Sequence, residues 1–156
     1  MTLAFEVPYN NRIASAGTTV LSPSLKNASS EISVFNIPRT DWQREAERRL
    51  VQLIRLRPGW DGHQGKPANL TIAEYAYILL EALLSRHNIP LPTISPLSYG
   101  GLMLEWHRKG WDIEIEIDAP GSLQVYTREL SSGVEDEVRL GRRLDRLRDI
   151  VGKVAD

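Results

Sequence analysis

A group of acidic side chains with one histidine is the part of the chain best suited to chemistry. Glu105 and His107 stand two residues apart, and Asp112, Glu114 and Glu116 follow at the same spacing. Residues two apart lie on one face of a β-strand, so these side chains are predicted to share a sheet face. Such carboxylates can hold Mg²⁺ or Mn²⁺ for phosphodiester hydrolysis, attract a basic protein surface, or simply solvate a half-exposed sheet.

A metal-dependent nuclease is the weaker functional interpretation of this group. The acidic run is not followed by the lysine that a restriction-type nuclease strand carries, and the three histidines of the chain have no metal-binding spacing. Neither a Gly-x-Ser-x-Gly elbow nor a phosphate-binding glycine loop occurs. We therefore expect no catalytic residue, no bound metal and no cofactor. The residues interpreted as partner-binding are Glu105, His107, Asp112, Glu114 and Glu116.

Charge and composition narrow the class of partner. Nineteen Lys and Arg residues nearly balance twenty Asp and Glu residues, so the net charge of -1 draws the protein neither to nucleic acid nor to a membrane. Cysteine is absent and the N-terminus lacks the regions of a signal peptide, which favours the cytoplasm. We expect a protein partner, basic where it meets the acidic group, and the composition is also compatible with a homo-oligomer.

Arginines in two other segments offer an alternative, which is DNA binding. They are concentrated at positions 44–57 and 139–148. Acidic residues stand at ion-pairing distances along the same segments, which favours salt-bridged helix surfaces exposed to solvent. A DNA-binding or DNA-mimic accessory role is the corresponding alternative hypothesis.

Alternation of apolar and polar residues predicts the sheet that would position the acidic group. It extends over residues 102–107 and again over 112–118, where isoleucine occupies every second position. A two-residue turn at 108–109 is predicted to pair Glu105 with Asp112. Both strands would then turn their apolar side chains to the same face.

A second turn extends the predicted meander to a further strand. Ala119-Pro120-Gly121 is predicted to form a three-residue turn, with Gly121 in the left-handed conformation. This turn would pair Ile117 with Leu123 and leave the aliphatic side chains on the face already defined.

Helical periodicity predicts three helices around this sheet. The first covers residues 40–57 and begins with a capping box between Thr40 and Gln43. The second begins with a capping box at Thr71 and is apolar around most of its circumference, which predicts burial. The third is predicted at residues 135–154, after a glycine turn.

Three residues are interpreted as structural anchors rather than ligand platforms. Trp60 and Asp61 lie in a glycine-rich loop, and Trp106 lies on an apolar strand position. Large aromatic side chains dominate packing, which makes an anchoring role the simpler interpretation.

Several short motifs resemble those of a family of short, functionally uncharacterised bacterial proteins. They are Gly59-Trp60-Asp61-Gly62, Pro92-x-Ile94-x-Pro96, Gly100-Gly101-Leu102-Met103-Leu104-Glu105-Trp106 and Ile113-Glu114-Ile115-Glu116-Ile117. The resemblance extends over residues 59–128, and Gly62-His63-Gln64-Gly65 departs from the Gly-Tyr-Gly-Ala of the family. It implies at most a defence, counter-defence or toxin-neutralising context.

Together these patterns predict an α+β fold. A three- to four-stranded antiparallel meander packs against two or three helices within residues 39–156, and residues 1–38 form a polar, flexible N-terminal arm. The leading functional hypothesis is a non-enzymatic protein-binding module of antitoxin, immunity or phage-related type, which uses the acidic face and the arm.

Overall fold

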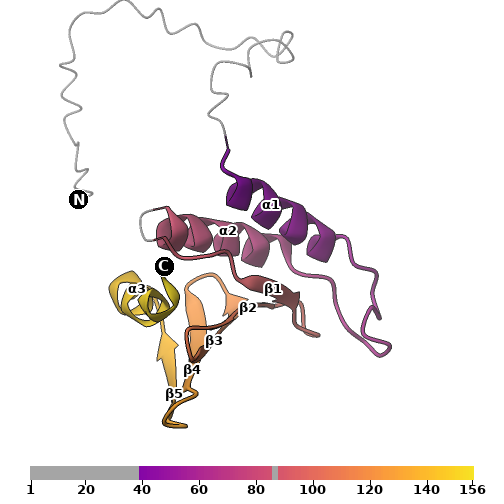
Figure 1. Cartoon of the computed structure of the whole chain (residues 1–156). Coiled ribbons are helices and arrows are strands. Elements are labelled where there is room, and N and C mark those ends of the chain that lie inside the picture. The colour runs from indigo at the N-terminus through magenta and orange to yellow at the C-terminus, as the bar shows by residue number, and fades with distance from the viewer. Residues whose placement is uncertain (1–38, 86–87) are drawn as a thin grey trace, which may run out of the picture. The chain divides into compact units, whose positions relative to one another are not determined.

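Residues 39–85 and 88–156 are described by the computed structural model, and they form an antiparallel sheet with helices on one face (Figure 1). The predicted α+β class is confirmed, with five strands in the order β1-β2-β3-β4-β5 rather than three or four. The predicted arm lies outside the described residues.

The elements in chain order are α1 (Asp41–Ile54), α2 (Leu70–Leu84), β1 (Thr93–Pro96), β2 (Leu102–Arg108), β3 (Trp111–Ala119), β4 (Ser122–Glu129), β5 (Glu135–Leu140), α3 (Leu144–Val151) and the 3₁₀ turn η2 (Gly152–Val154).

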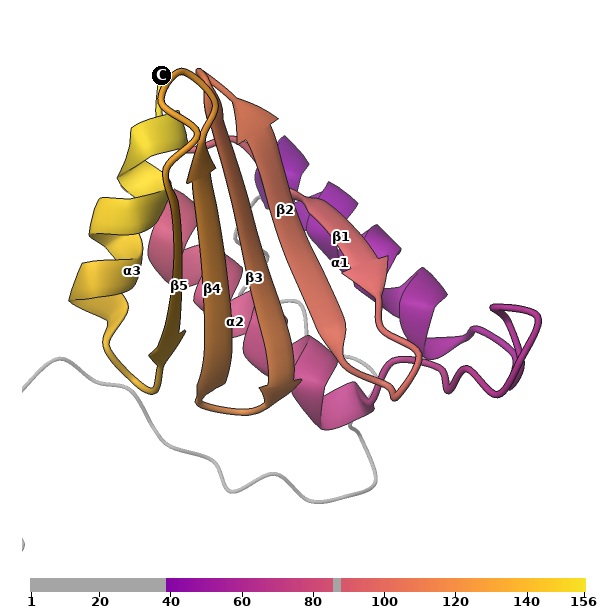
Figure 2. The same ribbon diagram turned by 90° about the horizontal axis from the view of Figure 1, so that it is seen from below.

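The two faces of the sheet differ as the alternation predicts. Ile113, Ile115 and Ile117 are 0% exposed and face the helices, whereas the acidic residues between them are partly exposed on the other face. Figure 2 shows the five strands in front of the helices, so within the described part of the chain no helix covers this second face. We call it the open face.

The predicted register of the β2–β3 hairpin is wrong by two residues. Glu105 pairs with Glu114, and His107 pairs with Asp112. The turn lies at Lys109 and Gly110, which both have positive φ (53° and 77°), because a tight hairpin turn of this kind requires that conformation at both central residues. A slip of two residues leaves every side chain on its predicted face.

The register of the β3–β4 hairpin is confirmed. Ile117 pairs with Leu123, and Asp112 pairs with Arg128. Gly121 is left-handed, with φ of 79°, and the pairing is irregular between Ile117 and Ala119. The turn therefore feeds β4 into the sheet with its aliphatic residues facing the helices.

The helix predicted at residues 135–154 is wrong in its first part. Residues 135–140 form the edge strand β5, which pairs with β4, and α3 begins only at Leu144. The acidic start of this segment is typical of a helix N-terminus, but Val138 and Leu140 alternate with Glu137 and Arg139 at the spacing of a strand. Pairing with β4 satisfies the backbone of this segment, and Leu140 is only 1% exposed.

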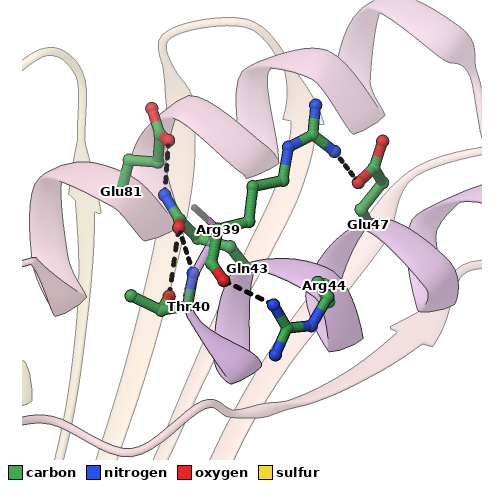
Figure 3. Close-up of polar contacts among 6 residues, drawn as sticks. All are labelled: Arg39, Thr40, Gln43, Arg44, Glu47 and Glu81. Carbon is green, nitrogen blue, oxygen red and sulfur yellow. Dashed lines mark hydrogen bonds and ion pairs between the residues drawn. The ribbon is translucent and has the colours of Figure 1, made fainter. Parts of the chain in front are cut away.

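Caps define the starts of α1 and α2. The predicted capping box of α1 is confirmed, and the Thr40 backbone N–H donates to Gln43 Oε1 at 2.8 Å (Figure 3). The predicted capping box at Thr71 is wrong, because the N-cap of α2 is Asn69, two residues earlier, and its Oδ1 accepts from the Thr71 backbone N–H at 2.9 Å. Helix α1 ends at Ile54, three residues before the predicted end at Arg57.

The core lies between the sheet and the helices. Buried residues of β2, β3 and β4 belong to the same core as Leu53 of α1, Leu80 and Leu83 of α2, and Leu147 of α3. These four leucines are at most 2% exposed.

Within residues 39–85 and 88–156, no helix has both the length and the apolar composition that a membrane span requires.

Candidate functional site

The open face carries the sequence-predicted site residues in three rows that run across the strands. The middle row is Glu105, Glu114, Tyr126 and Glu137, from β2 to β5. One flanking row is Met103, Glu116, Gln124 and Arg139, and the other is His107, Asp112, Arg128 and Glu135. The fold thus brings all five predicted partner-binding residues onto one surface.

The middle row places like charges directly opposite each other. Glu105 and Glu114 are cross-strand partners, and the same row continues to Glu137 without any basic residue. Like charges at directly opposed positions destabilise a sheet, typically by a few tenths of a kcal/mol. This row therefore costs stability in the isolated domain.

The row that contains His107 is largely neutralised. His107 Nδ1 lies 2.9 Å from Asp112 Oδ1 and its Nε2 lies 4.0 Å from Glu105 Oε1, while Arg128 Nε lies 3.6 Å from Glu135 Oε1. The hydrogen bond to Asp112 raises the pKa of His107, and the charges of Asp112 and Glu105 add to this effect. A protonated His107 would thus reduce the negative charge at this end of the open face.

The titration of His107 gives a testable pH dependence. Its pKa is higher in the folded protein than in the unfolded chain, so its contribution to stability is fully present below the ordinary histidine pKa and is lost as the pH rises through the folded value. Asp112→Asn is expected to lower the pKa of His107 toward its ordinary value, as measured by NMR titration of the ring proton. Asp118→Asn, which removes an exposed carboxylate farther along β3, should leave that titration unchanged. An unchanged His107 pKa in Asp112→Asn would contradict the assigned cause.

Among the described residues, the side chains of the remaining row make hydrogen bonds but no ion pairs. The hydroxyl of Tyr99, from the loop before β2, donates to Glu116, and the side-chain amide of Gln124 donates to Glu137. Partial burial, together with the hydrogen bond to Glu116, raises the pKa of Tyr99, so its hydroxyl stays protonated and available as a donor. Arg139 Nη2 donates to Gln124 Oε1 at 3.0 Å rather than to a carboxylate.

Three carboxylates of the open face therefore lack a cation. Among residues 39–85 and 88–156, no basic nitrogen lies within 4.0 Å of Glu114, Glu116 or Glu137. Together with Met103, Gln124 and Tyr126 they line a shallow hollow of about 240 Å³. Its lining combines three carboxylates with an aromatic and a thioether side chain, a combination that suits the ammonium or guanidinium group of a long basic side chain.

The same arrangement does not gather the ligands of a metal ion. Asp112, Glu114 and Glu116 follow one another along a single strand, about 7 Å apart from one to the next. A divalent cation needs several oxygens within about 2.6 Å of one point. Within the described residues, no group of three or more potential metal ligands converges.

The predicted anchors occupy supporting positions away from the open face. Trp106 is 3% exposed and its Nε1 donates to the Pro90 carbonyl at 2.8 Å, which ties β2 to the segment before β1. Trp60 Nε1 donates to the Lys66 carbonyl at 2.9 Å. Asp61 Oδ1 accepts from the backbone N–H groups of His63 and Gly65, and these bonds lower the pKa of Asp61.

The arginines of the alternative DNA-binding hypothesis are distributed over separate elements. Arg44 and Arg48 pair with acidic residues on the same helix, α1, and Arg148 pairs with Asp145 on α3. Arg139 lies on β5, at the edge of the acidic open face. Several of these charges are thus compensated locally, as the helix spacing predicts.

The hollow also contains three residues of β4 and β5 that are not among the predicted site residues, namely Gln124, Tyr126 and Glu137. The helix predicted for residues 135–154 keeps Glu137 out of the predicted sheet, whereas the structure has a strand there. The alternation of charged residues (Glu135, Glu137 and Arg139) with Val138 and Leu140 is the pattern in the sequence that indicates a strand here, with Glu137 on its polar face.

Comparison with known proteins gives no relative from which to transfer a function. No protein-family model matches the chain, and no curated protein and no solved structure matches it. Any functional conclusion therefore depends on the geometry of the open face.

Proposed function

We propose that this protein is a non-enzymatic protein-binding module whose open face binds a basic surface of its partner. The observation that carries the proposal is a group of three carboxylates, Glu114, Glu116 and Glu137, which have no basic nitrogen of the described residues within 4.0 Å and lie on the open face. Glu114 also lies directly opposite Glu105. A folded domain gains nothing from opposed like charges, whereas a basic partner converts their repulsion into attraction.

The hollow at Tyr126 supplies the geometric part of the proposal. The hollow offers a partner a site where a side chain can be desolvated and held. Met103 and Tyr126 provide apolar area for the stem of a lysine or arginine, and Glu114 and Glu137 provide acceptors for its charged end. Such a surface would suit the tight binding and neutralisation of a cytoplasmic toxin-like or nuclease-like partner, in line with an antitoxin or immunity role.

Site-specific photocrosslinking in the cells that naturally express the protein tests this proposal. A photoreactive residue in place of Gln124 probes the hollow, and the same residue in place of Val134, which is 63% exposed in the turn between β4 and β5, is the control. We expect a discrete crosslinked protein from position 124 and not from position 134. The double change Glu114→Arg and Glu137→Arg should remove that product, because it reverses two charges of the hollow. Absence of a product at 124, or a product insensitive to this charge reversal, would refute the proposal.

Glu114→Gln separates the stability of the domain from its binding. Removing the charge opposite Glu105 is expected to raise the free energy of unfolding by about 0.5 kcal/mol, measured by urea denaturation. The same change should reduce the yield of the crosslink at position 124. Asp136→Asn, at an exposed residue of β5 whose cross-strand partner is Thr127, should do neither. A lower stability of Glu114→Gln would mean that the opposed carboxylates do not repel each other.

A further inference from the structure

The two edges of the sheet, formed by β1 and β5, differ in what they offer to another strand (Figure 2). Strand β1 has only four residues and includes Pro96, which has no backbone N–H to donate. The Ile94 carbonyl is also occupied, because Arg49 Nε of α1 donates to it at 2.9 Å. This edge is therefore short and partly capped, as expected of an edge that does not pair with another chain.

The other edge, β5, is six residues long and turns the backbone groups of every second residue outward. The Glu129 N–H donates to the Val134 carbonyl at 2.9 Å, so this pair begins the β4–β5 ladder. Hydrogen-bonded and non-hydrogen-bonded pairs alternate along an antiparallel ladder, so the even-numbered residues of β5 bond to β4. The N–H and C=O groups of the odd-numbered residues point away from β4, and these residues are Glu135, Glu137 and Arg139.

The outward groups of β5 are free to pair with another chain. Within residues 39–85 and 88–156, β5 has β4 as its single neighbour in the sheet, and no backbone hydrogen bond uses these groups. The three residues that carry them are also exposed. An extended segment laid beside β5 would bond to all of them through its own main chain, which is the basis of recognition by strand addition.

This edge lies next to the hollow of the open face. The side chains of Glu135, Glu137 and Arg139 belong to the three rows of that face, and Glu137 lines the hollow. In a hydrogen-bonded antiparallel pair the opposite Cα lies about 5.5 Å away, and its side chain points to the same face. A long side chain opposite Glu137 would therefore reach the hollow.

We propose that the partner adds an extended, basic segment to β5, antiparallel to it, and places the side chain opposite Glu137 in the hollow. This inference rests on the proposed function, because it specifies how the same partner reaches the open face. The ladder would end opposite Glu135, so Val134, in the preceding turn, remains a suitable crosslinking control.

Charge selects a basic segment over a second copy of the chain. A second β5 brings two glutamates for each arginine among its outward residues, so negative charge stays in excess in every register. A segment with basic residues opposite Glu135 and Glu137 and an acidic residue opposite Arg139 makes an opposite-charge pair at each position, and such pairs stabilise antiparallel strands. It also brings positive charge to the three carboxylates of the hollow.

Hydrogen exchange of the full chain, followed by NMR, tests the ladder. The probe is a capped peptide of the length of β5, with glutamate, lysine and lysine in this order at alternate positions and valine between them. In the free protein, the backbone N–H groups of the odd-numbered residues of β5 should exchange faster than those of its even-numbered residues. Saturating peptide should slow the odd-numbered groups at least about tenfold. A control peptide with both lysines replaced by glutamate should leave them unchanged.

Two variants at one position separate strand addition from attraction by charge alone. Arg139→Pro removes an outward N–H, and proline is tolerated at an edge position whose N–H faces solvent. Arg139→Thr makes the same change of charge and keeps the N–H. We expect Arg139→Pro to bind the lysine peptide about tenfold more weakly than Arg139→Thr, because it loses a main-chain hydrogen bond and its ring obstructs the peptide. Thermal unfolding verifies that both variants fold.

Three results with the lysine peptide would overturn the proposal: binding that leaves the odd-numbered groups of β5 in fast exchange, no binding up to about 1 mM, or equal affinities of the two variants. Exchange that slows with protein concentration in the absence of peptide would assign the edge to a second copy, and would overturn it as well. The proposed function has a separate readout, which is the crosslink at position 124. A partner crosslinked at position 124, together with unprotected β5 groups, would retain the proposed function and reject strand addition.

Discussion

Ile115→Ala is expected to lower the free energy of unfolding by about 3 kcal/mol. Ile115 lies at the centre of the central strand β3, is 0% exposed, and has Leu104 and Val125 as its cross-strand neighbours. The substitution removes buried methyl and methylene groups and leaves a cavity that the neighbouring strands and the helix layer cannot fill by small shifts. Urea denaturation monitored by tryptophan fluorescence measures the loss as a lower midpoint at unchanged slope.

The adjacent residue supplies the matched control for that result. Glu114→Ala changes the same strand one position earlier, but on the open face. It should leave the free energy of unfolding unchanged or raise it slightly, because it removes a carboxylate opposed to Glu105. Equal losses for the two variants would show that the strand does not separate a buried face from an open one.

Trp106→Ala is expected to cost about 4 kcal/mol of folding free energy, the other large effect. The ring is 3% exposed between the sheet and the segment before β1, and its N–H satisfies the Pro90 carbonyl. Trp106→Phe keeps most of the apolar area and leaves that carbonyl without its donor, so a loss of about 1 to 2 kcal/mol is expected.

Trp60 provides the comparison for Trp106. It makes the same kind of hydrogen bond, to the Lys66 carbonyl, but it lies partly exposed in the loop between α1 and α2. Trp60→Ala should therefore cost clearly less than Trp106→Ala in the same denaturation experiment. A larger loss for Trp60→Ala would mean that this loop, rather than the junction of β1 and β2, limits the stability of the domain.

Local patterns in the sequence were sufficient for the central part of the fold. The alternation of residues 112–118 determines which side chains of β3 are buried, and Pro120-Gly121 determines the register with β4. Both are decided within a few residues, by the two-residue repeat of a strand and by the backbone preferences of glycine and proline. The capping box at Thr40 is local in the same sense.

Elements whose conformation depends on a distant neighbour were not predicted correctly. Residues 135–140 have an acidic start that is equally typical of a helix, and they form a strand because the free edge of β4 offers hydrogen bonds to them. Likewise β1, only four residues long, exists as a strand because β2 pairs with it.

The sequence by itself determined that a group of carboxylates would share one side of a sheet, since side-chain direction in a strand follows from position alone. Only the tertiary structure decided which of these charges oppose each other. The β2–β3 turn at Lys109 and Gly110 places Glu105 against Glu114 instead of Asp112, and the docking of β5 adds Glu137 to the same row. The spatial order of charges depends on strand pairing and turn geometry, and these are set by contacts between residues far apart in the chain.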